Sequence, residues 1–167
     1  LAKPEELDRF LEEIFDRADI DISIKTRIGR DEPEEFERLL EIYNQYPLKE
    51  LIIHPRVQQD YYNNCPNLAV FGAGLSESRC PVCYNGDIFT VEDFRRLVGR
   101  FPDIQTVMLG RGIIGNPFLM EQARKDGERK EEICAKPGER LKAFHDKVLA
   151  DYMEINFGDK NVLFKMK

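Results

Sequence analysis

The 167-residue sequence lacks any apolar run of about 18 residues, the length that a membrane-spanning helix requires. It also lacks the basic stretch followed by an apolar stretch that marks an export signal at an N-terminus. We therefore expect a cytoplasmic protein that makes no membrane contact. Hydrophobic residues make up 42% of the chain and charged residues 34%, a balance typical of a globular protein with a packed core.

Cysteine is scarce, and its spacing argues against a metal site. The four cysteines are Cys65, Cys80, Cys83 and Cys134, and among them the Cys80–Cys83 pair alone has the spacing of a metal or redox motif. A structural zinc ion needs two further ligands at suitable spacing, and Cys65 does not provide a second pair. Cys83 falls in an apolar run, where a free cysteine behaves as a small hydrophobe. We expect no metal.

A surplus of positive charge is also missing. The net charge of −6 argues against a protein that binds nucleic acid over its whole surface. Residues 136–167, however, carry 7 basic and 5 acidic side chains, so a polyanion would favour this tail. The chain begins at Leu1 without a methionine, and its first dozen residues already have a helical pattern, so we expect a fragment of a longer protein.

Short aliphatic runs alternate with amphipathic segments along the first three quarters of the chain. The predicted strands are residues 20–25, 51–54, 81–85 and 106–109. The predicted helices between them are residues 33–46 and 91–101, where apolar side chains recur at three- and four-residue steps. The strands start 25 to 31 residues apart, the length of a repeated β/α unit. This pattern predicts an α/β protein with a parallel sheet of four β/α units.

The remainder of the chain predicts a separate helical unit. A short helix is expected over residues 118–125, followed by a charged linker over 126–136. From Pro137 apolar residues form a helical stripe, and a second helix begins near Lys160. Four strands cannot close a barrel that needs eight, so an edge and an apolar inner face should remain open. Either an N-terminal half-barrel or a second copy of the chain would cover them.

Polar residues cluster where each predicted strand ends. They are Lys25 and Arg27, His54 and Arg56, Asn85, Gly86 and Asp87, and Gly110, Arg111 and Gly112. Each group alone is an ordinary strand terminus, buried histidine or turn. The carboxyl ends of parallel strands meet on one face, however, and active sites of β/α barrels lie there. Together the groups predict one pocket.

The last two of these loops suit a phosphate group. Glycines let backbone N–H groups approach an anion, and a following helix adds its dipole. If the third and fourth strands are the seventh and eighth of a whole barrel, Gly86 and Gly110 would line such a site. Arg111 could add a bidentate contact to the same anion.

Four motifs in this order and spacing resemble the second half of the tRNA-dihydrouridine synthases. They are Ile24–Gly29 (IKTRIG), His54-Pro55-Arg56, Tyr84–Ile88 (YNGDI) and Met108–Gly112 (MLGRG) with Asn116-Pro117. The resemblance covers about residues 1–125 and implies the C-terminal half of a (β/α)8 TIM barrel. Residues 137–167 resemble the start of that family's helical domain, which implies tRNA as a partner.

The resemblance implies an FMN cofactor across the top of the barrel, reduced by NADPH, that passes a hydride to the C5=C6 bond of a uracil flipped out of tRNA. It implies that Lys25 stabilises the reduced flavin and that His54 hydrogen-bonds the flavin or the uracil, so these two are the catalytic candidates. The implied cofactor-binding residues are Lys25, His54, Asn85, Gly86, Asp87, Gly110 and Arg111. Arg27 and Arg56 are implied to bind the substrate base or phosphate.

Two departures from the family pattern affect the expected activity. Pro-Arg-Val-Gln follows His54 where the family commonly has Gly-Arg-Thr-Arg, which removes a hydroxyl and a cation near the RNA. The proton-donating cysteine of the family belongs to the first half of the barrel, and no cysteine here matches it, so we expect no synthase activity from this chain alone. Two alternatives are another FMN-dependent barrel, such as an ene-reductase or a dihydroorotate dehydrogenase, and a non-catalytic half-barrel scaffold. The basic helical tail favours RNA over a small metabolite.

Overall fold

The computed structural model describes residues 3–61, 63–124, 137–155 and 160–161. The chain divides into two compact units, Leu1–Arg124 and Lys125–Lys167, and each is described by itself. The predicted charged linker, residues 126–136, lies outside the described residues, as does most of the helix predicted near Lys160.

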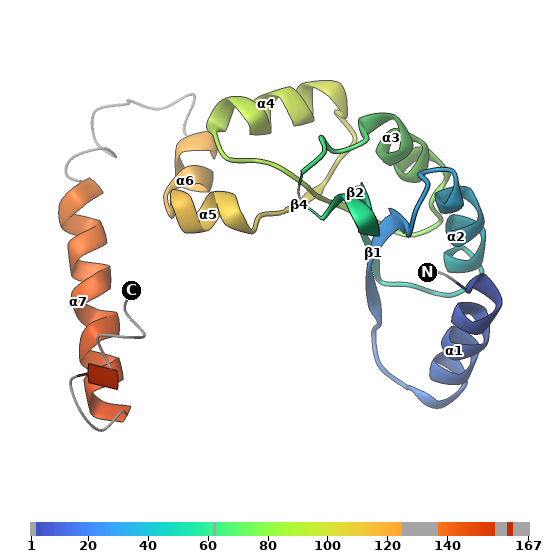
Figure 1. The fold of residues 1–167 in the computed structure, drawn as a ribbon, viewed down its shortest axis with the longest axis horizontal. Coiled ribbons are helices and arrows are strands. Elements are labelled where there is room, and N and C mark those ends of the chain that lie inside the picture. The colour runs from blue at the N-terminus through green and yellow to red at the C-terminus, as the bar shows by residue number, and fades with distance from the viewer. Residues whose placement is uncertain (1–2, 62, 125–136, 156–159, 162–167) are drawn as a thin grey trace. The chain divides into compact units, whose positions relative to one another are not determined.

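The first unit is a β/α repeat built on one parallel sheet (Figure 1). Its strands are β1 (Ser23–Gly29), β2 (Glu50–Val57), β3 (Val82–Asn85) and β4 (Thr106–Met108), in that order across the sheet. Its helices are α1 (Pro4–Arg17), α2 (Glu35–Tyr43), the short 3-10 helix η1 (Gln58–Asp60), α3 (Leu68–Glu77), α4 (Val91–Arg100), α5 (Arg111–Gly115) and α6 (Leu119–Arg124). Every strand pairs in parallel with the next along the chain, which confirms the predicted α/β class with four parallel strands.

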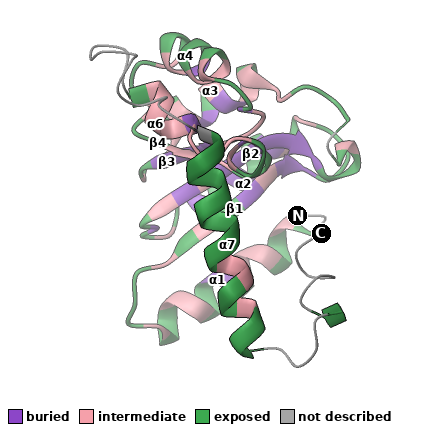
Figure 2. Cartoon of the chain, turned by 90° about the vertical axis from the view of Figure 1, so that its left-hand side faces the viewer, coloured by how far each residue is buried: buried purple, intermediate pink, exposed green. Residues whose placement is uncertain are grey.

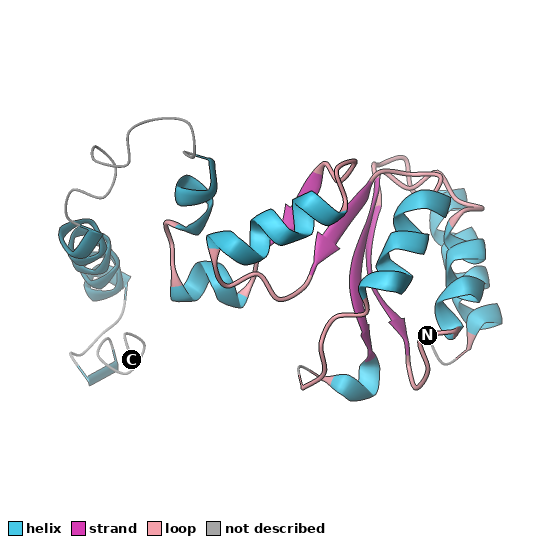
Figure 3. Ribbon diagram, turned by 90° about the horizontal axis from the view of Figure 1, so that it is seen from above, coloured by secondary structure: helices cyan, strands magenta, loops and turns pink. Residues whose placement is uncertain are grey.

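The core lies between the sheet and the helices that connect its strands (Figure 3). Phe71 of α3 is fully buried and meets Tyr84 of β3 edge to face, with ring centroids 4.9 Å apart. Burial of a phenylalanine side chain stabilises a fold by roughly 1.5–3 kcal/mol. At Gly74 an added Cβ would crowd the side chains of Phe36 and Ile53, so the glycine lets α3 lie close to the sheet. Figure 2 shows the buried residues concentrated in the strands.

Strand boundaries differ from the prediction at both ends of β1. The predicted start at Ile20 is wrong, because Ile20 is 75% exposed and precedes the strand. β1 also continues to Gly29, and β2 to Val57, beyond the predicted ends at Lys25 and His54. Lys25 therefore lies within its strand rather than at the end of it.

Two α-helices were not predicted. α3 carries apolar residues on most of its sides and two glycines, so it has no amphipathic stripe to reveal it. Its start is fixed by Asn67, whose side chain accepts hydrogen bonds from the N–H groups of Ala69 and Val70. α5 spans only five residues, too few for a periodic pattern.

The sheet face opposite the helices is not apolar, so that prediction is wrong. Across the middle of the sheet Lys25 pairs with Ile52, Ile52 with Cys83, and Cys83 with Thr106. Lys25 and Thr106 are exposed, as is Ser23 nearer the start of β1. The face is mixed because side chains of the candidate site lie on it.

The second unit contains α7 (Pro137–Ile155), which confirms the helix predicted from Pro137. Val148, Leu149 and Tyr152 are half-buried, whereas Leu141 and Phe144 are exposed. Within the part of the chain that the structure describes, no helix is both long enough and apolar enough to cross a membrane.

Candidate functional site

A pocket of about 120 Å³ lies at the carboxyl ends of the strands. It is lined by Lys25, His54, Asn85, Gly86, Asp87, Gly110 and Arg111. These are the seven residues predicted to bind a cofactor, so the fold brings them to one place. Small-molecule sites typically measure about 300–1,000 Å³, and this pocket can therefore hold only part of a nucleotide-sized ligand. A larger hollow of about 420 Å³, near Cys80 and Phe101, contains none of the predicted residues.

The loops that form the pocket require glycine. The Asn85 side-chain amide donates to the carbonyl oxygen of Met108 at 2.9 Å, which ties the end of β3 to the end of β4. An added Cβ at Gly86 would overlap the Tyr84 hydroxyl, and one at Gly112 would overlap the backbone oxygen of Ile88. The backbone can thus pack closely here only without side chains at these two positions.

Asp87 contacts two arginines, one buried and one half exposed. The Arg56 side chain is 1% exposed, and its Nη1 and Nη2 donate to Asp87 Oδ1 and Oδ2 at 3.2 and 2.5 Å. Its Nε donates to the Asn64 carbonyl oxygen, and its Nη1 lies 3.3 Å from His54 Nε2. Arg111, which is half exposed, donates from Nη2 to Asp87 Oδ1 at 2.7 Å. Asp87 therefore connects a buried cation to a cation of the pocket wall.

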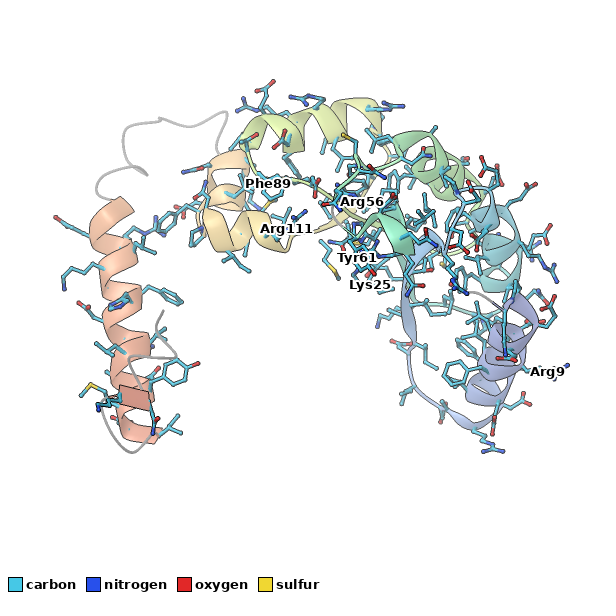
Figure 4. The ribbon with its side chains drawn as sticks, in the orientation of Figure 1. Arg9, Lys25, Arg56, Tyr61, Phe89 and Arg111 are labelled. Atoms are coloured by element: carbon cyan, nitrogen blue, oxygen red, sulfur yellow. The ribbon has the colours of Figure 1, made fainter. Side chains whose placement is uncertain are left out.

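The orientation of Arg111 is fixed from two sides. Its guanidinium lies over the Phe89 ring, 5.2 Å from the centroid, and contacts the Asp87 carboxylate (Figure 4). A hydrogen bond from Arg56, together with the charges of Arg56 and Arg111, holds the pKa of Asp87 below its usual value. Asp87 is accordingly a carboxylate at neutral pH, and Arg111 presents a positioned cation to the pocket.

His54 is a neutral hydrogen-bonding group in this site. Burial lowers its pKa to about 4, with further lowering by the positive charges of Arg27, Lys25 and Arg56. Because the arginine guanidinium can only donate, the contact with Arg56 requires His54 Nε2 to accept. The proton of the neutral ring then resides on Nδ1.

The two positive residues of β1 differ in their surroundings. Lys25 is exposed, and its pKa is lowered by partial desolvation and by the charge of Arg27. Arg27 donates from Nη1 to the Val57 carbonyl oxygen at 2.6 Å and from Nη2 to that of Tyr61 at 2.9 Å. Arg27 thus ties the end of β1 to the loop that follows β2.

The contacts of Arg56 favour a role other than the predicted substrate contact. Its guanidinium is buried and already engaged by Asp87 and Asn64, so it supports the pocket wall instead of facing a substrate. Phe89 and Tyr61 are site-associated residues that the sequence did not reveal. Phe89 could have been suggested by its position directly after the Tyr84–Ile88 motif, whereas no sequence signal marks Tyr61.

Cysteine does not contribute to the pocket in the part of the chain that the structure describes. Cys65 is exposed, Cys80 is half-buried and Cys83 is buried. Burial raises the pKa of Cys83 to about 11, so it remains a thiol. Among the described residues no cluster of three or more histidine, cysteine or carboxylate side chains could hold a metal ion.

Comparison with known proteins decides the family. The family model described as "Dihydrouridine synthase (Dus)" matches residues 1–166. The chain belongs to the dihydrouridine synthase family. This confirms the family suggested by the four motifs.

Three similar proteins come from Pseudomonas and Rhodobacter species. The tRNA-dihydrouridine(16) synthase of Pseudomonas putida is 28% identical over 131 residues, which cover 76% of this chain and 40% of the relative. A "Probable tRNA-dihydrouridine synthase" of Rhodobacter capsulatus is 25% identical over 123 residues, 73% of this chain and 38% of the relative. The tRNA-dihydrouridine(16) synthase of Pseudomonas syringae is 27% identical over 112 residues, 66% of this chain and 35% of the relative. The chain thus spans about two fifths of the length of the curated relatives it matches.

Proposed function

We propose that this chain provides the flavin-phosphate half of a cytoplasmic tRNA-dihydrouridine synthase, an FMN-dependent oxidoreductase that uses NADPH to reduce uridine in tRNA. The observation that carries the proposal is the single pocket that gathers all seven predicted cofactor-binding residues at the strand ends. Residues 137–167 would begin the helical unit that contacts tRNA.

The chemistry of the pocket fits a phosphate monoester. Lys25 and Arg111 bring two positive charges to its wall, and the one carboxylate, Asp87, is already paired with Arg56 and Arg111. Glycines at positions 86 and 110 would let backbone N–H groups approach an anion, whereas α5, with five residues, is too short to add a substantial dipole. Positioned donors and fixed cations of this kind bind phosphate without reorganisation.

Bound FMN, reduced by NADPH, would supply a hydride for the C5=C6 bond of uridine. The residues of this chain would bind and orient the reactants. Lys25 would place a cation beside the flavin ring, where negative charge develops on reduction. His54 would hydrogen-bond the flavin or the uracil, as the family resemblance implies. Arg27 would hold the loop after β2 next to the substrate.

The family resemblance implies a cysteine as the proton donor for the uracil, and no cysteine lines the described pocket, so the donor would come from outside it. The described sheet has four strands, with β1 and β4 at its edges. A closed barrel of this type has eight strands and no exposed edge. We therefore propose that a further half-barrel pairs with these edges and carries the donor; a second copy of this chain is the alternative partner.

Dihydrouridine in tRNA, measured by nucleoside mass spectrometry, tests this function. The chain incubated with FMN, NADPH and unmodified tRNA should form none. A fusion protein that joins the first half of the P. putida synthase to this chain should form dihydrouridine. Lys25→Ala in this fusion protein should abolish dihydrouridine formation. Dihydrouridine formed by the chain alone would contradict the proposal, as would an active Lys25→Ala fusion.

A further inference from the structure

Tyr61 combines an unfavourable backbone conformation with an exposed ring. Its φ is 50° and its ψ is −94°, and among the described residues it is the single non-glycine residue with positive φ. L-residues adopt such angles rarely and at a cost in stability. The Tyr61 side chain is nevertheless 69% exposed, so it does not offset that cost by packing in the core.

The loop that presents Tyr61 is held by several hydrogen bonds. Arg27 donates to the Tyr61 carbonyl oxygen at 2.9 Å, and the Gln59 backbone N–H donates to the Arg30 carbonyl oxygen at 3.2 Å. The Asp60 carboxylate accepts from the Val57 backbone N–H at 3.1 Å. The ring therefore stands on a backbone that is anchored to the ends of β1 and β2.

Tyr61 lines an open hollow of about 570 Å³ together with Arg30, Gln58 and Gln59. Asp31 accepts a hydrogen bond from the Gln59 side chain and lies 3.6 Å from Arg30 Nε. One aromatic ring, one cation and two amides match the groups that bind a nucleotide: a π-face for a base, a charge for a phosphate and amides for base edges or ribose. Arg27 donates to the Tyr61 carbonyl oxygen and is the register partner of His54, which lines the pocket at the strand ends.

We propose that Tyr61 is a stacking platform for a tRNA base next to the reacting uridine, with Arg30 contacting its phosphate. The inference rests on the proposed function, since it assumes that RNA approaches this end of the sheet. The proposal gives the exposed ring of Tyr61, labelled in Figure 4, a role in ligand binding in place of a role in the core.

A fluorescent variant reports the contact directly. The chain contains no tryptophan, so Tyr61→Trp introduces a single one at the proposed platform. Titration of this variant with unmodified tRNA should quench the tryptophan emission, whereas heparin, a polyanion without bases, should not. Binding of tRNA without quenching would overturn the proposal.

A pair of variants separates stacking from folding. Tyr61→Gly removes the ring and relieves the backbone, so it should raise the melting temperature while weakening tRNA binding about tenfold. Tyr61→Phe should keep wild-type affinity. Phe10→Ala, which removes an exposed ring from α1, is the matched control and should leave tRNA binding unchanged.

The outcomes distinguish this inference from the proposed function. Wild-type affinity of Tyr61→Gly for tRNA would overturn the stacking role alone. Failure of the wild-type chain to bind tRNA would overturn both the stacking role and the proposed RNA contact. Equal weakening of tRNA and heparin binding in Tyr61→Gly would show a charge or loop effect and would also overturn stacking.

Discussion

The Asp87 carboxylate neutralises Arg56, a guanidinium that is almost fully buried at the wall of the candidate site. The two partners are unequal, because the Asp87 side chain is 29% exposed and also contacts Arg111, whereas the Arg56 side chain is 1% exposed. A buried charge left without its partner is costly, and a partly solvated one is less so. The pair therefore predicts an asymmetric response to mutation.

Asp87→Asn should destabilise the chain more than Arg56→Met does. The first change leaves a buried cation without a counter-charge and should cost about 3 kcal/mol of unfolding free energy. The second leaves a carboxylate that keeps Arg111 and water as partners, and should cost about 1–2 kcal/mol. Urea unfolding followed by circular dichroism measures both values.

Arg111→Gln serves as the control for this comparison. Arg111 is half exposed, so loss of its ion pair with Asp87 should change the unfolding free energy by less than about 1 kcal/mol. The reverse order, with Arg56→Met the more harmful change, would show that Asp87 does not act mainly as the counter-ion of Arg56.

The stability of the chain should depend on pH through His54. Its pKa is about 4 in the folded chain, below the value of about 6.5 expected after unfolding, so protons bind preferentially to the unfolded chain. The stabilisation is complete above pH 6.5 and is lost as the pH falls toward 4. The urea midpoint of the wild type should thus fall between pH 7 and pH 5, and His54→Gln should remove this fall.

The other histidine of the chain provides the control for the pH experiment. His145 lies on an exposed part of α7, and His145→Gln should keep the wild-type slope. If His54→Gln retained the full slope, another group would be responsible and His54 would not be the buried neutral histidine described above.

Replacement of two glycines of α5 by alanine should change the free energy of unfolding differently at the two positions. At Gly112 an added Cβ would overlap the Ile88 backbone oxygen, which cannot move as a flexible side chain does, so Gly112→Ala should cost at least about 2 kcal/mol. At Gly115 nothing lies within 4 Å of the new atom, and Gly115→Ala should be neutral or stabilising by about 0.5 kcal/mol. Similar melting temperatures for the two variants would contradict the close packing of α5 against the loop after β3.

Hydrophobic patterning predicted the parallel sheet, and the strand-end positions predicted four of the pocket residues. Strands buried beneath helices require aliphatic runs, and parallel strands bring their carboxyl ends together, so Lys25, His54, Asn85 and Gly110 could be assigned to one pocket before the fold was known. The helix α3 could not be found in this way, because it is apolar on most sides and broken by glycines.

The sequence did not predict which charged side chains pair with one another. Nothing in the spacing of Arg56, Asp87 and Arg111 shows that one arginine is buried and the other half exposed. The positive φ of Tyr61 could not be predicted from the sequence either, because it depends on the path of the loop and on the hydrogen bond from Arg27. Such features depend on contacts between residues more than twenty positions apart.

The binding of FMN and of riboflavin to the chain, compared by flavin fluorescence, tests whether the pocket binds a phosphate group. The two ligands differ by the phosphate alone, so a phosphate pocket predicts FMN affinity at least about tenfold higher than riboflavin affinity, from one positioned charge-assisted contact. Arg111→Gln should remove most of that difference, whereas Arg95→Gln on the exposed face of α4 should keep it. Equal affinity for the two flavins, or an unchanged preference in Arg111→Gln, would contradict the account.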